Sequence, residues 1–330
     1  MKRVVRRPPP RVARILSALA VAALAIGLAR PAPAAIRRVP TDHPTVRAAV
    51  DAAANADTIL IAPGLHPGGV FVKGKSVTLA SWYILTGDTA AIAQTVIDSI
   101  VGNPCGTSTS CAGNAVVEFA SDAGGSAVIG LTVTRGEDGV RSHAPVNVAW
   151  CRVIGNADGL DYQSGSGGTI RNCLIANNND DGIDLNGRLT ATVQDNIIRD
   201  NHQDGVEFRL YAYAGPVQTI DFIGNRITGN GGDGIQLIDY PDASDRVIRI
   251  ERNLFSGNGD AAVGCMPNGQ TSEDFSGAPI AERVHLFHNT FTAGRYGFVG
   301  GANVIALNNV FTGHQASALR RVGGNSITSY

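Results

Sequence analysis

Short stretches of alternating apolar and polar residues fill the second half of the chain, and the same polar steps punctuate them. An Asp-Gly pair followed by an apolar residue recurs at intervals of 20, 23, 23 and 29 residues. These steps begin at Asp138, Asp158, Asp181, Asp204 and Asp233. Because one step returns at nearly constant spacing, the pattern indicates an internal structural repeat.

A second row of polar positions keeps step with the first. An Asn followed two residues later by an aliphatic residue or Phe occurs at Asn172, Asn196, Asn225, Asn253, Asn289 and Asn309. Another Asn follows five residues after four of these, at Asn177, Asn201, Asn230 and Asn258. Asn tolerates left-handed turns, and its amide can hydrogen-bond to the same amide in the next repeat. We therefore expect these asparagines to form structural ladders.

The repeat leaves no room for a helix between its strands. Short alternating stretches bounded by Asn, Asp and Gly suit strands of a few residues joined by tight turns. Parallel strands must then be joined by short bends, with successive coils about 4.8 Å apart. The pattern predicts an all-β fold, a single-stranded parallel β-helix (solenoid) of about ten coils.

The first 34 residues differ sharply from the rest in charge. They hold seven basic residues and no acidic one, an apolar run at residues 15–28, and small residues at 32–34. This pattern is typical of a cleaved signal peptide, although a buried helix with a basic flank has the same composition. We expect an exported protein that acts in the periplasm, in the medium or at the cell surface.

Composition then limits the function of the exported part. The whole chain has 27 Lys and Arg against 28 Asp and Glu, but residues 35–330 have 20 against 28, a net charge of −8. A negative chain is poorly suited to nucleic acid, because binding depends on neutralising phosphates. No long uncharged apolar run follows residue 35, so we do not expect a membrane-spanning protein. The sequence does not indicate an oligomeric state.

Export makes the five cysteines informative. Cys105 and Cys111 bracket a short loop, which favours a local disulfide in an oxidising compartment over a metal site. Cys151 and Cys173 are about one repeat apart, but their places in the repeat differ by one residue in our alignment. We therefore predict no bond between them. Cys265 is left over, and we expect it to be buried.

The repeat resembles that of the right-handed parallel β-helix proteins of the pectin-lyase-like superfamily. Residues 43–81 are also similar to the opening of that family, in which a short amphipathic helix caps the stack before the first strands. Val46, Ala49, Val50 and Ala53 lie at helical spacing, and residues 58–61 and 76–79 read as strands. The predicted layout is a signal peptide at 1–34, a cap and first coils at 35–115, and β-helix repeats at 116–330.

Outward positions carry the candidate chemistry. In a strand, the apolar residues two and four positions after each Asp point inward. The residues three and five positions after it therefore point to solvent. In successive repeats these outward residues are Arg141 and His143, Asp161 and Gln163, Asp184 and Asn186, Glu207 and Arg209, and Gln236 and Ile238. The carboxylates of Asp161, Asp184 and Glu207 should therefore stack on one sheet face.

Stacked carboxylates repel each other by about 1 kcal/mol per neighbouring pair in water, so something must compensate them. Ca²⁺ takes oxygen ligands at about 2.3–2.6 Å and could be shared by successive coils. The candidate metal ligands are Asp161, Asp184 and Glu207. The alternative is a hydrated outer face whose acids pair with Arg141 and Arg209.

The resemblance implies a further role for this face. In polysaccharide lyases of the superfamily it binds an acidic sugar chain, a cation or arginine neutralises the uronate carboxylate, and a basic side chain removes the adjacent proton. Carried over to this chain, Arg209 is the candidate base, with His143 and Arg188 as further catalytic candidates. Arg141, Tyr211 and Tyr213 are candidate substrate-binding residues.

The expected function is binding and β-elimination of an acidic, uronate-containing polysaccharide, with Ca²⁺ as a possible cofactor. Two alternatives stay open. Paired carboxylates can catalyse hydrolysis by general acid and base, and a non-catalytic β-helix could bind glycans or partners through its ladders.

Overall fold

The computed structural model describes residues 33–101, 115–211, 215–240, 246–266, 280, 282–300, 304–322 and 327–329. The predicted disulfide between Cys105 and Cys111 lies outside these residues, as do Tyr213 and residues 1–32 of the predicted signal peptide. Residues 34–330 form one unit. No helix in the described part of the chain has the length and apolar character needed to cross a membrane.

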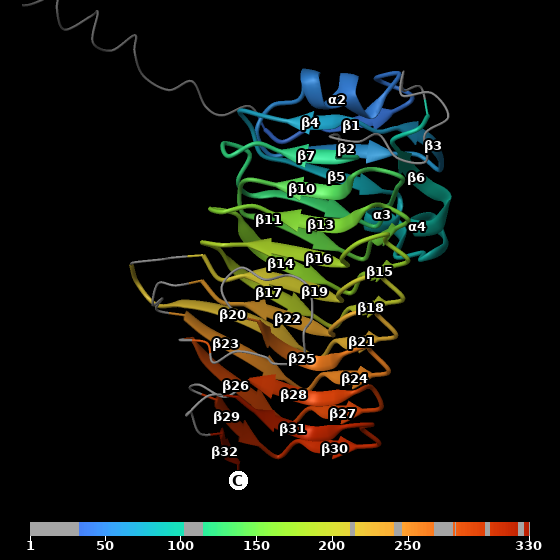
Figure 1. Ribbon diagram of the computed structural model, residues 1–330. Helices are drawn as coiled ribbons and strands as arrows, with labels where there is room; N and C mark the ends of the chain where they lie inside the picture. The colour runs from blue at the N-terminus through green and yellow to red at the C-terminus, as the bar shows by residue number, and fades with distance from the viewer. Residues whose placement is uncertain are drawn as a thin grey trace, which may run out of the picture. The chain divides into compact units, whose positions relative to one another are not determined.

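Three parallel sheets run the length of this unit, and the chain visits them in turn on every coil (Figure 1). Sheet A has twelve strands within the described residues, and sheets B and C have ten each. The number of coils and the parallel pairing confirm the predicted β-helix.

Sheet A contains β1 (Ile36–Val39), β2 (Asp57–Ile61), β5 (Val77–Ser81), β8 (Ser126–Ile129), β11 (Val146–Ala149), β14 (Gly167–Arg171), β17 (Thr190–Gln194), β20 (Gln218–Ile223), β23 (Arg246–Glu251), β26 (Arg283–Phe287), β29 (Val304–Leu307) and β32 (Ile327–Ser329). Sheet B contains β3 (Gly64–Pro67), β6 (Thr95–Asp98), β9 (Thr132–Thr134), β12 (Arg152–Ile154), β15 (Leu174–Ala176), β18 (Ile197–Arg199), β21 (Arg226–Thr228), β24 (Leu254–Ser256), β27 (Thr290–Thr292) and β30 (Val310–Thr312). Sheet C contains β4 (Val70–Val72), β7 (Val117–Phe119), β10 (Asp138–Ser142), β13 (Asp158–Tyr162), β16 (Ile183–Asn186), β19 (Val206–Arg209), β22 (Ile235–Ile238), β25 (Ala261–Met266), β28 (Tyr296–Gly300) and β31 (Ser317–Arg321).

The predicted capping helix is α2 (Val46–Ala52), which lies over the first coil (Figure 1). Thr45 begins it by accepting the backbone N–H of Ala48 at 3.1 Å, which satisfies one of the free donors of the first turn. Val46, Ala49 and Val50 are buried, so this helix closes the open end of the core. The sequence did not predict the two short helices α3 (Tyr83–Thr86) and α4 (Ala90–Gln94), which interrupt the coil between β5 and β6.

The core consists of rows of apolar side chains contributed by all three sheets. Val140, Leu160, Ile183 and Val206 stack along sheet C, and all are fully buried. In sheet B the rings of Phe255 and Phe291 stack with centroids 5.0 Å apart. Side chains at one repeat position therefore form continuous buried contacts along the helix axis.

Two asparagine ladders form at the turns, but their membership corrects our alignment. One contains Asn196, Asn225, Asn253, Asn289 and Asn309, and the other contains Asn156, Asn178, Asn201, Asn230 and Asn258. Each ladder residue donates its backbone N–H to the Oδ1 of the next coil's Asn, as from Asn196 to Asn225 at 3.0 Å. Asn172 and Asn177, assigned to the ladders from sequence, each lie one residue too early and adopt left-handed backbone angles.

The same offset corrects the alignment of the two cysteines, although the prediction that they form no bond is confirmed. Cys173 occupies the position next to Asn196, to whose Oδ1 it donates its backbone N–H at 2.9 Å. Cys151 occupies the position before it and donates its own N–H to Cys173 Sγ at 3.4 Å. The two cysteines are therefore in register, not offset, and both are buried free thiols. Cys265 is buried, as expected.

Candidate functional site

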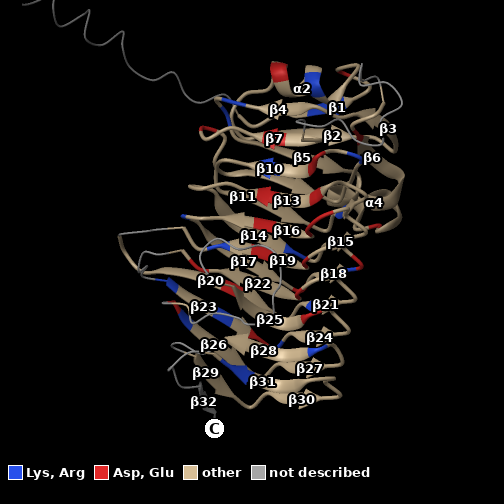
Figure 2. Ribbon diagram, viewed as in Figure 1, with Lys and Arg blue, Asp and Glu red and all other residues tan. Residues whose placement is uncertain are grey.

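The outer row of sheet C has the register that the alternation predicts. Arg141, Asp161, Asp184, Glu207 and Gln236 are direct partners on successive strands. Figure 2 shows that acidic residues recur along these strands of sheet C. The three predicted carboxylates thus form one row, which we call the acidic row.

The acidic row is far less exposed than expected. Asp161, Asp184 and Glu207 expose only 5%, 7% and 3% of their surface, whereas we predicted a solvent-facing row. Their side chains point away from the apolar core, but neighbours on adjacent coils and two long arginine side chains cover them. Buried charges require partners, and the structure provides some of them.

Arg141 and Arg209 supply most of the compensation. Arg209 Nη1 donates to Asp184 Oδ2 at 2.8 Å and to Asn186 Oδ1 at 3.0 Å, and Arg209 also pairs with Glu207. Arg141 Nε lies 3.2 Å from Asp161 Oδ2. Arg141 and Arg209 therefore neutralise part of the charge of the acidic row, as the predicted alternative of a salt-bridged face states.

Side-chain amides complete the pairing of Asp161. Gln163 Nε2 donates to both of its carboxylate oxygens, at 2.6 and 2.7 Å. Asn186 Nδ2 bridges Asp161 Oδ1 at 3.1 Å and Asp184 Oδ2 at 2.9 Å. The buried Asp184 Oδ1, in contrast, has no hydrogen-bond partner within the described residues.

A second row of carboxylates lies at the turns that lead into sheet C. Each of these aspartates accepts, through its Oδ1, the backbone N–H of the corresponding aspartate on the next coil. Asp158 accepts from Asp181 at 3.1 Å, Asp181 from Asp204 at 2.7 Å, and Asp204 from Asp233 at 2.5 Å. This confirms the turn role expected for the Asp-Gly aspartates.

The two rows together hold more negative charge than the arginines balance. Burial, followed by the neighbouring Asp161, raises the pKa of Asp138 to about 8. Burial raises the pKa of Asp158 and of Glu207 to about 7, although Arg209 opposes the shift at Glu207. Burial and the adjacent Asp204 also raise the pKa of Asp181. Such clustered, perturbed carboxyl groups mark a candidate functional site.

Two sets of three carboxylates place their oxygens close enough to share a cation. In the first set, Asp158, Asp180 and Asp181, one oxygen of each lies within 4.8 Å of the others. Asp181 also joins Asp204 and Glu207 in the second set. Of the predicted ligands, Glu207 belongs to such a set, whereas Asp161 and Asp184 do not.

The sequence pattern did not mark these turn aspartates as candidate ligands, because Asp recurs at such turns for structural reasons. The neighbouring pair Asp180-Asp181 was the available signal. Asp181 makes the turn bond to the backbone N–H of Asp204, whereas the side chain of Asp180 bonds to Gln203. Hard oxygen donors in such a set fit Ca²⁺, and Asp158 and Asp180 are partly exposed, so an ion from solvent could reach them.

The other predicted residues lie around the rows. His143 Nε2 is 3.5 Å from Glu118 Oε1, on the coil of Arg141 and away from Glu207. Arg188 lies at the opposite end of the strands, where it lines a cavity of about 440 Å³ with Ser166 and Gln218. Of the three catalytic candidates, Arg209 alone contacts the acidic row.

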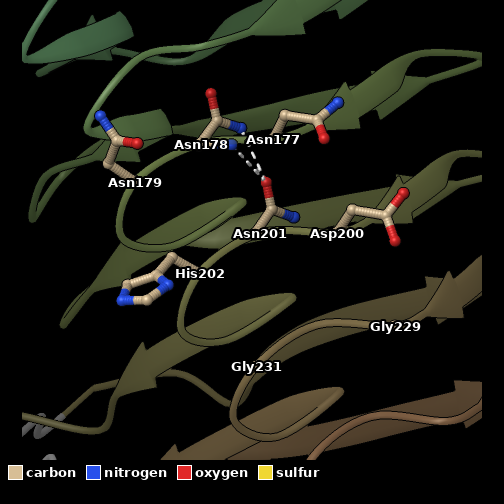
Figure 3. A pocket seen from close by; sticks show the side chains of 8 residues that line it. All are labelled: Asn177, Asn178, Asn179, Asp200, Asn201, His202, Gly229 and Gly231. Atoms are coloured by element: carbon tan, nitrogen blue, oxygen red, sulfur yellow. Dashed lines mark hydrogen bonds between the residues drawn. The ribbon is translucent and has the colours of Figure 1, made fainter.

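A further cavity of about 410 Å³ lies at the turns between sheets B and C, beside the turn aspartates. Asn179 and His202 point to one side of it and Asn177 and Asp200 to the other, with the bond between Asn178 and Asn201 at its base (Figure 3). The amides, the carboxylate and the imidazole of this lining give it a polar surface. Polar groups of this kind can bind sugar hydroxyls.

Comparison with known proteins assigns the family. The model for the right handed beta helix region matches residues 137–328. No curated protein matches the chain in sequence.

Among solved structures, the chain is similar to the A-module of the mannuronan C-5 epimerase AlgE4 of Azotobacter vinelandii, with 15% identity and a TM-score of 0.54 over 83% of this chain and 91% of that one. It is also similar to the pectate lyase Pel9A, with 17% identity and a TM-score of 0.53 over 86% and 71% of the two chains. A third is the catalytic unit of an α-1,3-glucanase of Streptomyces thermodiastaticus, with 16% identity and a TM-score of 0.53 over 92% and 69%. At such identities the likeness concerns the fold. The chain belongs to the right-handed parallel β-helix family, with the pectin-lyase-like architecture.

Proposed function

We propose that this protein is exported, binds an acidic, uronate-containing polysaccharide on the outer face of sheet C, and cleaves it by β-elimination. One observation carries the proposal: Arg209 lies at the surface of a buried carboxylate cluster that still has an unpaired oxygen, Asp184 Oδ1. Such a cluster is unsatisfied by the protein's own cations, which favours a bound cation.

Calcium fits the oxygens of Asp158, Asp180 and Asp181, which leaves Glu207 outside the proposed ligand set. The ligands first predicted, Asp161, Asp184 and Glu207, lie on the same face. When bound there, the cation would neutralise negative charge that builds up on a uronate carboxylate.

Arg209 is the residue proposed to contact the uronate carboxylate. Burial alone would lower its pKa, but the carboxylates of Asp184 and Glu207 outweigh that effect and hold the pKa above its usual value. A guanidinium that stays protonated cannot accept a proton. Its proposed role therefore changes from base to charge neutralisation, for which its planar fork suits a carboxylate.

Glu207 is then the proposed base. Its pKa of about 7 lets it accept a proton near neutral pH. In the elimination it would take the C5 proton while the C4–oxygen bond breaks with its electron pair, which leaves a C4–C5 double bond. If Arg209 turns to the substrate, Glu207 loses its ion-pair partner. Its carboxylate then becomes more accessible, and its pKa rises further because the neighbouring positive charge has moved away.

A non-catalytic role remains the second candidate, and one observation favours it. The pairs from Arg141 to Asp161 and from Arg209 to Asp184 already neutralise part of the acidic row. Hydrolysis by two carboxyl groups of raised pKa is a third reading of the same cluster.

Ultraviolet absorbance separates the three. The mature protein is incubated with a panel of uronate polysaccharides, with calcium or with chelator, and new reducing ends are counted in parallel. Elimination gives absorbing unsaturated ends that depend on calcium, hydrolysis gives reducing ends without absorbance, and neither signal appears if the protein only binds.

A further inference from the structure

A column of side chains runs along the downstream edge of sheet C, two residues beyond the end of each strand. Asn186, Arg209 and Ile238 are direct partners on β16, β19 and β22. The residues two positions later are Arg188, Tyr211 and Tyr240, and the bond from Leu210 N–H to Ile238 O at 2.9 Å keeps the coils aligned there. Tyr211 packs against Gly187 rather than against Arg188, so this edge presents two aromatic rings, Tyr211 and Tyr240, on successive coils.

The two rings form an aromatic pair in which Tyr211 is exposed and Tyr240 is half-buried. Their centroids are 4.4 Å apart, and their planes meet at 43°. Tyr211 is 40% exposed, so one face of its ring is open to a ligand. It packs over Gly187, where an added Cβ would lie 2.9 Å from ring carbon Cδ2. The glycine thus leaves the space that lets the ring lie flat against the coil.

A buried ion pair fixes the backbone beneath this pair. Arg246 is fully buried, and its Nη2 donates to Tyr211 O at 2.6 Å and to Gly187 O at 3.3 Å. Its Nη1 lies 3.3 Å from Glu282 Oε1. A desolvated guanidinium is costly unless it is paired and hydrogen-bonded, so its placement under an exposed loop residue indicates that the position of Tyr211 is constrained.

The aromatic pair lies next to the proposed reaction site. Tyr211 follows Arg209 by two residues, which limits the distance between their Cα atoms to about 7 Å. A sugar ring bound at Arg209 would therefore have its neighbour in the chain within reach of the tyrosines. The apolar face of a pyranose ring stacks well on an aromatic ring that has a polar tip.

We infer that Tyr211 and Tyr240 form a stacking subsite for a pyranose unit of the polysaccharide, next to the unit held by Arg209, and that Arg246 is a positioning residue for it. The sugar chain then crosses the coils of sheet C, with a uronate carboxylate at Arg209 and the next ring on the tyrosines. This inference rests on the proposed function.

Binding measurements test the subsite without relying on turnover. Calorimetric titration with a hexamer of galacturonate and with a hexamer of mannuronate is carried out in calcium and in chelator. Tyr211→Ala and Tyr240→Ala should each weaken binding of the preferred hexamer at least tenfold, whereas Tyr211→Phe and Tyr240→Phe stay within threefold. Trp82→Ala removes another exposed aromatic ring (47% exposed), on the segment before α3, and should bind as the unaltered protein does.

Arg246→Lys tests the positioning role. Lysine keeps the charge beside Glu282 but cannot reach both carbonyls, so affinity for the hexamer should fall while calcium still raises the melting temperature. If this variant does not fold, Gly187→Ala moves the same ring from its other side and should weaken binding equally.

The outcomes separate this inference from the proposed function. Alanine variants that bind as tightly as the unaltered protein overturn the subsite, even if the protein is a lyase. If binding depends on the tyrosines but no products form and calcium has no effect, the subsite is retained and the lyase proposal is overturned. No binding of either hexamer overturns both.

Discussion

Arg209 reaches back one coil to Asp184, with its Nη1 donating to Oδ2 at 2.8 Å, while the other oxygen of Asp184 is buried and has no hydrogen-bond partner in the described part of the chain. The arginine therefore compensates only part of the negative charge around it. This incomplete neutralisation distinguishes the face from a salt-bridged surface, and it motivates the following predictions.

Two substitutions of Arg209 should distinguish the effect of its positive charge from the effect of its planar guanidinium shape. Arg209→Met removes the cation beside Asp184 and Glu207 and should reduce elimination at least a hundredfold, a loss typical of a removed electrostatic stabiliser. Arg209→Lys should retain an intermediate rate because it keeps the charge without the planar fork. Initial rates by absorbance measure both, and Arg226→Met, an exposed arginine on sheet B, is the control. A Met variant with full activity would remove Arg209 from the site.

Stability should fall as pH rises through neutrality. The pKa values of about 8 for Asp138 and about 7 for Asp158 and Glu207 lie above the ordinary range near 4. Between about pH 4 and pH 8 the folded protein then binds more protons than the unfolded chain, so the free energy of unfolding decreases with pH. Urea denaturation in chelator at several pH values measures this decrease. Asp138→Asn should flatten the slope, and stability that rises over this window would contradict the assignment.

Calcium should stabilise the folded protein. A ligand at a hundred times its Kd contributes about 2.7 kcal/mol, so calcium should raise the melting temperature by several degrees relative to chelator. Asp180→Asn removes one carboxylate of the proposed ligand set and should abolish most of that rise. Asp195→Asn, an exposed acid at another turn, should leave it unchanged. An equal calcium effect in both variants would place the ion elsewhere.

The asparagine ladders should contribute directly to stability. Asn225 accepts the N–H of Asn196 at 3.0 Å and donates to Val193 O and Asn253 Oδ1 at 2.8 and 2.9 Å. Asn225→Ala leaves these buried groups unpaired and should cost about 2–3 kcal/mol. Asn179→Ala changes an exposed amide at a similar turn and should cost less than about 0.5 kcal/mol. Chemical denaturation compares the two, and equal costs would refute the ladder's role.

Much of this architecture follows from the sequence, because a side-chain period of two and a recurring Asp-Gly step determine which residues face outward. Asp161, Asp184 and Glu207 were placed in register on that basis. The ladder positions of Asn172 and Asn177 were wrong by one residue. In the folded chain a left-handed residue precedes each ladder asparagine, as Asp195 precedes Asn196, and several residue types can occupy that turn.

The burial of the row could not be predicted from the same pattern. The exposure of a side chain depends on the conformations of the long side chains around it. Arg209, two residues after Glu207 on the same strand, pairs with Glu207 and covers it. The contact between Tyr211 and Tyr240 was equally hidden, because 29 residues separate them and the length of that coil is not regular.

The most direct test of the central claim is the absorbance of unsaturated ends formed from uronate polysaccharides, compared for the unaltered protein and Asp184→Asn, with calcium and with chelator. A calcium-dependent rise that Asp184→Asn lowers at least tenfold is the predicted result. Absorbance that stays flat on every polysaccharide, with no new reducing ends, would contradict cleavage and leave a protein that binds glycans without altering them.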